Sequence, residues 1–254
     1  MFERFVAIGD STTEGLDDPD GSGGYRGWAN RLAESIAAAG SGRLLYANLA
    51  VRGRVAAQVR AEQLPAALAL RPDLASVGAS LNDVLRPSFD VELVVVHVEE
   101  MLSALAAVGA TVLTFTMPDP GSVMPLARPL RPRLVALNEA LRGAARRTGA
   151  LIVDLGDVPV AGDPRLWSQD RLHPSSAGHA RIAAAFAQAL QLPGSDGSWA
   201  DPLPPLERRR RREVVMAEVS WAGMHLLPWV ARRARGRSSG DGRLAKRAEL
   251  APFP

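Results

Sequence analysis

The sequence predicts an α/β protein with a three-layer, doubly wound, parallel five-stranded sheet and a basic helical extension at its C-terminus. Short apolar runs alternate with longer stretches of helical periodicity, which is typical of βαβ units with helices on both faces of the sheet. Residues 199–254 break this alternation and carry an excess of positive charge. The expected strands lie within residues 5–8, 44–47, 72–77, 111–116 and 151–153.

The individual elements follow from local patterns. Residues 5–8 are all apolar and stop at Gly9, which is typical of a strand buried on both faces. Trp28, Leu32 and Ile36 are spaced by four and would share one face of a helix. The expected helices lie at 27–39, 55–70, 90–108, 131–148, and from a cap at Ser175 or Ser176 to about residue 190.

Composition excludes several classes of protein. With 254 residues, 47% hydrophobic and 22% charged, the chain is typical of a globular domain rather than a disordered one. It contains no Cys, which excludes disulfides, thiolate metal sites and a Cys nucleophile. No apolar run reaches the roughly 18 residues of a membrane span. The first ten residues lack the pattern of a signal peptide, so we expect a cytoplasmic protein.

The net charge of +3 is unevenly distributed. Residues 1–198 contain 18 basic and 21 acidic residues, a balance of −3, whereas residues 199–254 contain 12 and 6, a balance of +6. A nucleic-acid-binding domain would carry its positive charge across the fold. We therefore expect no nucleic-acid partner for the main body.

The C-terminal quarter reads as an appendage. Residues 1–193 form the expected main domain, residues 194–206 a Gly-, Ser- and Pro-rich linker, and residues 207–254 a basic amphipathic helix with an irregular tail from 236. Pro228 should kink this helix or end its first part. The helix could dock on the domain and cover the entrance to its ligand site, make peripheral contact with an anionic membrane surface, or bind nucleic acid through its phosphates. The sequence favours docking, because an apolar stripe without a partner would stay exposed.

Among the four histidines, one stands in a loop suited to catalysis. His173 follows Asp170 by three residues and precedes Pro174, which disfavours helix at His173. This spacing lets the Asp170 carboxylate meet one ring nitrogen of His173, while the other nitrogen faces outward as a general base. An Asp and a His at this spacing also occur by chance. The alternative to a catalytic pair is therefore an ordinary loop carboxylate and a surface imidazole.

A nucleophile and its oxyanion donors follow other expected strands. Ser11 lies directly after the first strand, at the edge where parallel sheets bind ligands. With His173 and Asp170 it would complete a triad, since triads are defined by geometry and not by chain order. The backbone N–H groups of Ser11 and Gly53 and the side-chain amide of Asn82 could form the oxyanion hole. Taken singly, each of these residues is as well explained as a cap or a turn residue.

Four blocks of sequence together resemble the SGNH hydrolases, also called GDSL esterases and lipases. The blocks are 9–15 (GDSTTEG), 48–53 (NLAVRG), 82–83 (ND) and 170–173 (DRLH). The resemblance covers about residues 4–192 and includes the order and spacing of the blocks. It implies a flavodoxin-like strand order 2-1-3-4-5, a serine nucleophile and hydrolysis of carboxylic esters without a cofactor or a metal.

One position departs from the family's pattern. The third block of the family begins with Gly, and Ser80 occupies the matching position here. A side chain at Ser80 could narrow the site or alter its loop, with consequences for substrate breadth. Asp83 is interpreted as structural, and Glu14 as a candidate partner for an Arg.

Two other functions remain open at this point. The same fold could serve as a non-catalytic small-molecule or phosphate-binding module, although the first loop lacks the glycine fingerprints of nucleotide sites. The basic extension could instead make the protein a membrane-surface lipid acylhydrolase. The residues do not distinguish short esters, acetylated sugars and lysophospholipids as substrates, nor do they give the oligomeric state.

Overall fold

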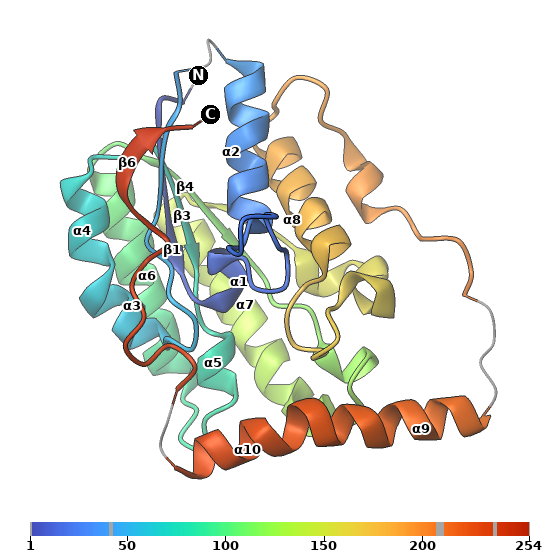
Figure 1. Cartoon of the computed structure of the whole chain (residues 1–254). Coiled ribbons are helices and arrows are strands. Elements are labelled where there is room, and N and C mark those ends of the chain that lie inside the picture. Colours follow the sequence, from blue (N-terminus) through green and yellow to red (C-terminus); the bar gives the residue numbers. More distant parts are fainter. Residues whose placement is uncertain (1, 41–42, 207–210, 236–237, 254) are drawn as a thin grey trace.

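The computed structural model describes residues 2–40, 43–206, 211–235 and 238–253. Its centre is a six-stranded sheet of order β5-β4-β3-β1-β2-β6 (Figure 1). The first five strands are parallel and follow the expected order, but the expected number of five strands is wrong, because β6 pairs antiparallel with β2 as a sixth. The strands are β1 (Arg4–Gly9), β2 (Leu45–Asn48), β3 (Leu74–Gly78), β4 (Thr111–Phe115), β5 (Leu151–Val153) and β6 (Arg247–Pro252).

Helices cover both faces of the sheet, as expected for a doubly wound fold. Helices α2 and α8 pack against each other on one face, and α3, α4, α6 and α7 cover the other (Figure 1). The main-body helices are α1 (Ser11–Glu14), α2 (Gly27–Ala39), α3 (Ala56–Glu62), α4 (Leu64–Ala69), α5 (Leu81–Val84), α6 (Val91–Ala107), α7 (Arg131–Thr148) and α8 (Ser176–Ala189). The single helix expected over 55–70 is two helices, because Pro65 lacks the N–H group that would continue α3 and instead begins α4.

The centre of the sheet is apolar and tightly packed. Every residue of β1 after Arg4 is buried. On one face Trp28 of α2 stacks on Phe186 of α8 with ring centroids 4.7 Å apart, and the edges of both rings contact Phe115 of β4. Because the sheet is rigid at this point, the loops that follow its strands are held in fixed positions.

Strands β1 and β3 approach closely where they end. Gly9 has φ +154°, and a Cβ atom there would lie 2.3 Å from the carbonyl oxygen of Gly78. Gly9 also exchanges two hydrogen bonds with the buried side-chain amide of Gln63. The end of β1, and with it the start of α1, is therefore fixed on both sides.

The tail expected to be irregular from residue 236 contains strand β6, so that expectation is wrong for residues 247–252. In a five-stranded sheet β2 would be an open edge, and pairing with β6 closes it. Phe253 packs edge-on against Tyr46 of β2, and Arg247 donates a hydrogen bond to the Tyr46 carbonyl. Ala, Glu and Pro are depleted in strands, so the sequence RAELAP does not by itself identify this strand.

Residues 211–234 form one continuous helical rod, which we call the C-terminal helical segment. It consists of α9 (Arg211–Trp221), a π-helical turn (Ala222–Leu226) and α10 (Leu227–Ala234). The π turn precedes Pro228 and accommodates it, so the rod continues beyond the proline. The sequence predicts that this helix begins at residue 207, but residues 207–210 lie outside the described residues. Among the helices that the structure describes, none has the length and apolarity of a membrane span.

Candidate active site

The carboxyl ends of the parallel strands form the floor of a cavity of about 410 Å³. Ser11 follows β1, Gly53 follows β2, Asn82 follows β3, and Asp170 and His173 come from the loop before α8. All five of these sequence-predicted residues line this one cavity. The fold thus brings together segments that are far apart in the sequence, at the edge where α/β sheets bind ligands.

Ser11 occupies the first position of the short helix α1. The preceding residue, Asp10, caps this helix by accepting a hydrogen bond from the backbone N–H of Thr12 at 3.1 Å. The first N–H groups of a helix have no partner inside it. The Ser11 backbone N–H is therefore suited to bind an oxygen that develops negative charge beside its own side chain.

The loop around His173 orients the imidazole. The Oδ2 atom of Asp170 lies 2.6 Å from Nδ1 of His173, and Oδ1 accepts hydrogen bonds from the backbone N–H groups of Leu172 and His173 and from the Ser168 hydroxyl. With both oxygens engaged, the carboxylate has little freedom to rotate. Nδ1 is directed to Asp170, which leaves Nε2 as the nitrogen available for proton transfer.

Charge pairing shifts both of these groups. Burial alone would lower the pKa of His173, but the hydrogen bond and charge of Asp170, helped by Asp17 and Asp10, outweigh it and raise this pKa above its ordinary value. Burial alone would raise the pKa of Asp170, whereas the hydrogen bond to His173 holds it far below its ordinary value. Asp170 is therefore ionised throughout the neutral range and stabilises an imidazolium.

A second carboxylate stands near the same ring nitrogen. Oδ2 of Asp17 lies 3.7 Å from Nδ1 of His173, and Asp17, Asp170 and His173 each offer one ligand-type atom within 4.8 Å of the others. The short contact between Asp170 and His173 already uses Nδ1. We therefore interpret the two carboxylates as electrostatic support for a protonated imidazole rather than as metal ligands.

Gly53 is positioned by a buried ion pair between Glu14 and Arg52. The sequence indicates Glu14 as a candidate partner for an Arg but does not identify which one. Glu14 binds the guanidinium group of Arg52 through both carboxylate oxygens and also accepts the backbone N–H of Arg52 at 2.7 Å. Both side chains are about nine-tenths buried. The pair joins α1, which carries Ser11, to the peptide just before Gly53. Glu14 is thus the partner of Arg52, and it fixes the backbone N–H groups of Ser11 and Gly53 relative to each other.

Asn82 is held by two acceptors. Its amide nitrogen donates to Oδ2 of Asp10 at 3.2 Å and to the carbonyl of Arg54 at 3.1 Å. Asp10 is fully buried, and this burial raises its pKa to about 7 despite the bonds to Thr12 and Asn82. Asn82 therefore shares its donors with a carboxyl group that titrates near neutrality.

Ser80 explains why the family favours glycine at this position. Its φ is +130°, a region that strains any residue with a Cβ atom, and its buried hydroxyl has no hydrogen-bond partner among the residues that the structure describes. The side chain is fully buried and is not among the residues that line the cavity. Of the two expected effects, the structure therefore favours an altered loop over a narrowed site, because the departure places strain in the loop before Asn82.

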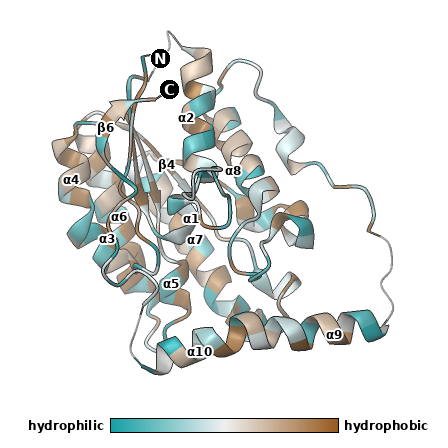
Figure 2. Ribbon diagram, in the orientation of Figure 1, coloured by the Kyte–Doolittle hydropathy of each residue, from teal (hydrophilic) through white to brown (hydrophobic). Residues whose placement is uncertain are grey.

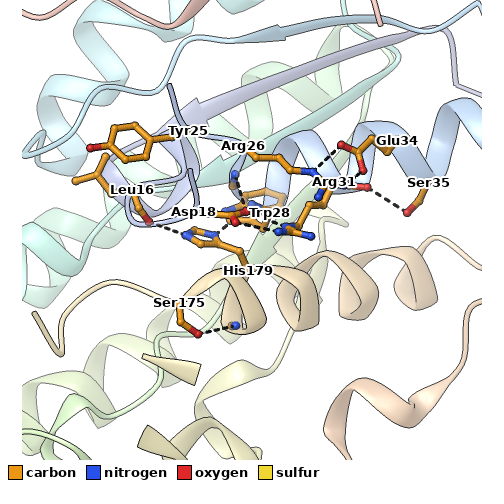
Figure 3. Close-up of polar contacts among 12 residues, drawn as sticks. Leu16, Asp18, Tyr25, Arg26, Trp28, Arg31, Glu34, Ser35, Ser175 and His179 are labelled. Atoms are coloured by element: carbon orange, nitrogen blue, oxygen red, sulfur yellow. Dashed lines mark hydrogen bonds and ion pairs between the residues drawn. The ribbon is translucent and has the colours of Figure 1, made fainter. Parts of the chain in front are cut away.

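The loop that follows α1 is anchored by the buried polar cluster drawn in Figure 3. Nδ1 of His179 accepts the backbone N–H of Trp28 at 3.2 Å, and Nε2 donates to the carbonyl of Leu16 at 2.9 Å. Asp18 binds Arg31 through both oxygens and accepts the N–H of Gly27. His179 is thus a structural histidine, in line with its expected place inside the last helix of the main body.

The C-terminal helical segment lies across the carboxyl edge of the sheet (Figure 1). Trp221 donates from Nε1 to the carbonyl of Asp170 at 3.2 Å, and its ring lies 4.8 Å from the guanidinium carbon of Arg171. Arg171 also pairs with Glu218 at 2.7 Å. Farther along the chain, Ser238 packs against Gly53. The segment docks on the loop that carries the His173 imidazole, as the sequence favoured.

Comparisons with known proteins identify the family of this chain. Residues 7–181 match the model of the GDSL-like lipase/acylhydrolase family. The chain is 29% identical over 197 residues to the GDSL lipase Rv0518 of Mycobacterium tuberculosis, a match that covers 74% of this chain and 81% of that protein. A solved α/β hydrolase, LAE5, from the metagenome of Lake Arreo is 25% identical with a TM-score of 0.59, covering 75% of this chain and 95% of its own.

A more distant structure shows the same fold. An acetylxylan esterase from Geobacillus stearothermophilus is 18% identical with a TM-score of 0.61, covering 74% of this chain and 94% of its own. The family match extends over more than half of the chain and includes the segments that carry Ser11, Gly53, Asn82, Asp170 and His173. The chain therefore belongs to the GDSL-like lipase/acylhydrolase family of SGNH hydrolases.

Proposed function

We propose that this acylhydrolase cleaves carboxylic esters through a triad of Ser11, His173 and Asp170 and an acyl-enzyme intermediate. One observation supports this proposal above the others: five residues selected for ester chemistry, from four separate segments, line a single cavity. The short contact between Asp170 and His173 adds the oriented base that a serine hydroxyl needs to become nucleophilic.

In the proposed mechanism, Nε2 of His173 takes the hydroxyl proton of Ser11 as Oγ attacks the ester carbonyl carbon. The carbonyl oxygen becomes an oxyanion, held by the N–H groups of Ser11 and Gly53 and by the amide of Asn82. The imidazolium then gives its proton to the leaving alcohol, and the acyl group stays on Ser11. Water attacks this acyl-enzyme with His173 again as the base, and the acid product leaves.

The wall of the cavity supports esters with an apolar acyl chain. Leu85, Met124, Leu126 and Leu130 contribute apolar side chains beside the five site residues. A second apolar cavity of about 80 Å³ is lined by Thr12 and Leu81, the neighbours of Ser11 and Asn82. Both cavities are lined by Leu172, so the second apolar cavity lies beside the first.

Replacing Ser11 tests the nucleophile. Ser11→Ala should abolish turnover of p-nitrophenyl acetate and labelling by a fluorophosphonate probe, while the far-UV circular dichroism spectrum stays unchanged. Asn82→Ala should keep the fold and lose about 2.7–4 kcal/mol of transition-state stabilisation, which is a fall of 10²–10³ in kcat. Undiminished turnover in Ser11→Ala would contradict the triad. A wild-type chain that is neither labelled nor active would favour the non-catalytic binding module.

A panel of p-nitrophenyl esters tests the substrate class. The catalytic efficiency should rise from the acetyl ester to esters of medium chain length, because each buried methylene contributes about 0.8 kcal/mol. A preference for acetyl esters that falls with every added carbon would contradict an apolar acyl site. The cytoplasmic location expected from the first ten residues stays a prediction, which cell fractionation would test.

A further inference from the structure

The C-terminal helical segment has two different faces. Toward the enzyme, Trp221, Leu226 and Trp229 line the cavity above Ser11. Away from it, large apolar side chains face solvent, with exposed fractions between 53% and 73%. They are Val215, Met216, Val219, Met224 and Leu227. We call these five residues the outer stripe; a stripe of this size on a docked helix indicates a second binding partner.

The outer stripe joins the mouth of the cavity. Met224 lines the cavity and is nevertheless 62% exposed, and Leu126, which lines the same cavity, is 67% exposed. These two side chains therefore stand at an apolar rim, where the cavity meets the outer face. A partner seated on the stripe would lie directly against the entrance.

Charge indicates the chemistry of that partner. Residues 207–237 contain nine Arg and three Glu, a balance of +6, in a chain whose first 198 residues carry −3. Glu218 is already paired with Arg171. Figure 2 shows hydrophilic residues at the two ends of the segment and hydrophobic residues between them. Exposed Arg212 near one end, with Arg232 and Arg235 near the other, flank the apolar centre.

We propose that the outer stripe and its flanking arginines bind an anionic phospholipid surface, with the segment lying flat in the interface. A helix with an apolar strip and flanking cations lies in this way, with the apolar side chains among the acyl chains and the guanidinium groups on phosphates. Lipid binding itself does not depend on the proposed ester-hydrolase function; only its biological role, the supply of an ester substrate, rests on that function. When the segment lies in the interface in this way, the rim at Met224 and Leu126 faces the lipid, and an ester substrate would enter the cavity from there.

Vesicle binding tests the proposal without hydrolysis. The full-length Ser11→Ala chain is sedimented with vesicles of phosphatidylcholine alone and with vesicles containing 30% phosphatidylglycerol. We expect binding to the anionic vesicles at least tenfold tighter than to the neutral ones, and weaker as salt is raised. Because this chain has no nucleophile, a failure of the esterase proposal does not affect the readout. Equal binding to both vesicles, or binding to neither, overturns the proposal.

Matched substitutions locate the surface. On the same background, Val219→Glu with Leu227→Glu, or Arg212→Gln with Arg232→Gln, should each weaken anionic-vesicle binding at least tenfold. The control pair is Val108→Glu with Arg146→Gln, near the ends of α6 and α7 at the opposite edge of the sheet, and it should bind like the parent. Deleting the segment together with the tail is unsuitable, because it also removes strand β6.

Another copy of the chain is the competing occupant of the stripe. Light scattering of the same variants distinguishes it from lipid. A parent that is dimeric, becomes monomeric in Val219→Glu with Leu227→Glu, and does not sediment with anionic vesicles assigns the stripe to a second copy and overturns the proposal. A monomeric parent that sediments with anionic vesicles supports it.

Discussion

At the scale of single residues, three carboxyl groups act on one imidazole. Asp170 contacts His173 directly, whereas Asp17 and Asp10 act on it through their charge, and Asp10 also binds Asn82. A triad motif predicts the first carboxylate but not the other two, because their effect depends on how the fold places them near the imidazole. The motif supplies the chemistry of the base, and the fold decides the pH at which that base works.

This arrangement predicts a specific pH dependence. His173 must be neutral to act as a base, so activity should be lost as the pH falls through its pKa, which lies above the ordinary value of 6.5. The charge of Asp10 contributes to that elevation. Asp10→Asn keeps a capping side chain for α1 but removes the charge, so the acidic limb of kcat/KM should move to lower pH.

The control for this experiment is Asp20→Asn, whose fully exposed carboxyl binds only its own turn. Its pH profile should coincide with that of the wild type. A limb in Asp10→Asn that stays at the wild-type midpoint, or moves to higher pH, would show that Asp10 has no electrostatic effect on His173.

At the scale of elements, the sequence predicts the parts that are locally determined. The apolar run at 5–8 identifies β1 without knowledge of its neighbours, and the residues after each strand identify the binding edge. Strand β6 and the pairing of Glu14 with Arg52 depend on contacts between distant segments, and local pattern does not reveal them. The break at Pro65 is different, because a proline is a local signal for a helix boundary, and the apolar pattern of residues 55–70 concealed it.

The bond between α1 and the Gly53 loop leads to a second prediction. Arg52→Lys keeps the charge but cannot bind both oxygens of Glu14 in the planar geometry of a guanidinium group. The Gly53 N–H should then lose its fixed position, and kcat should fall by about ten- to a hundredfold with a much smaller change in KM, because the oxyanion forms only in the transition state.

Arg54→Lys provides the comparison, since Arg54 lies in the same loop and pairs with Glu62 outside this bond. Its kcat should stay within about twofold of the wild type, as expected for a partly exposed ion pair. If both lysine variants lose the same activity, the Glu14–Arg52 pair has no special role in positioning Gly53.

At the scale of the whole molecule, the two ends of the chain converge on the same site. The first strand carries Ser11, and the C-terminal helical segment closes the cavity above it. Downstream of that segment, Ser238 packs on Gly53, and Lys246 donates to the carbonyls of Tyr25 and Arg26. The division into a domain, a linker and an appendage remains a proposal, but these contacts favour a tail that is part of the folded body.

Global stability should depend on the protonation of His179. Burial lowers the pKa of His179 to about 4, because the ring is surrounded by protein and Nδ1 must stay unprotonated to accept the Trp28 N–H. In the unfolded chain the pKa is close to 6.5. A group with a lowered folded pKa contributes stability that is complete above the unfolded pKa and is lost as the pH falls toward the folded one.

Denaturant unfolding of wild type and His179→Gln between pH 7.5 and pH 5 measures this contribution. The variant should be less stable at pH 7.5, because the bonds to Trp28 and Leu16 are weakened. The difference in unfolding free energy should then shrink by about 2 kcal/mol at pH 5, where the wild type loses its advantage and glutamine has nothing to titrate. A difference that stays constant across this range would show that His179 is not held neutral by the fold, and the cluster of Figure 3 would then have to tolerate an imidazolium.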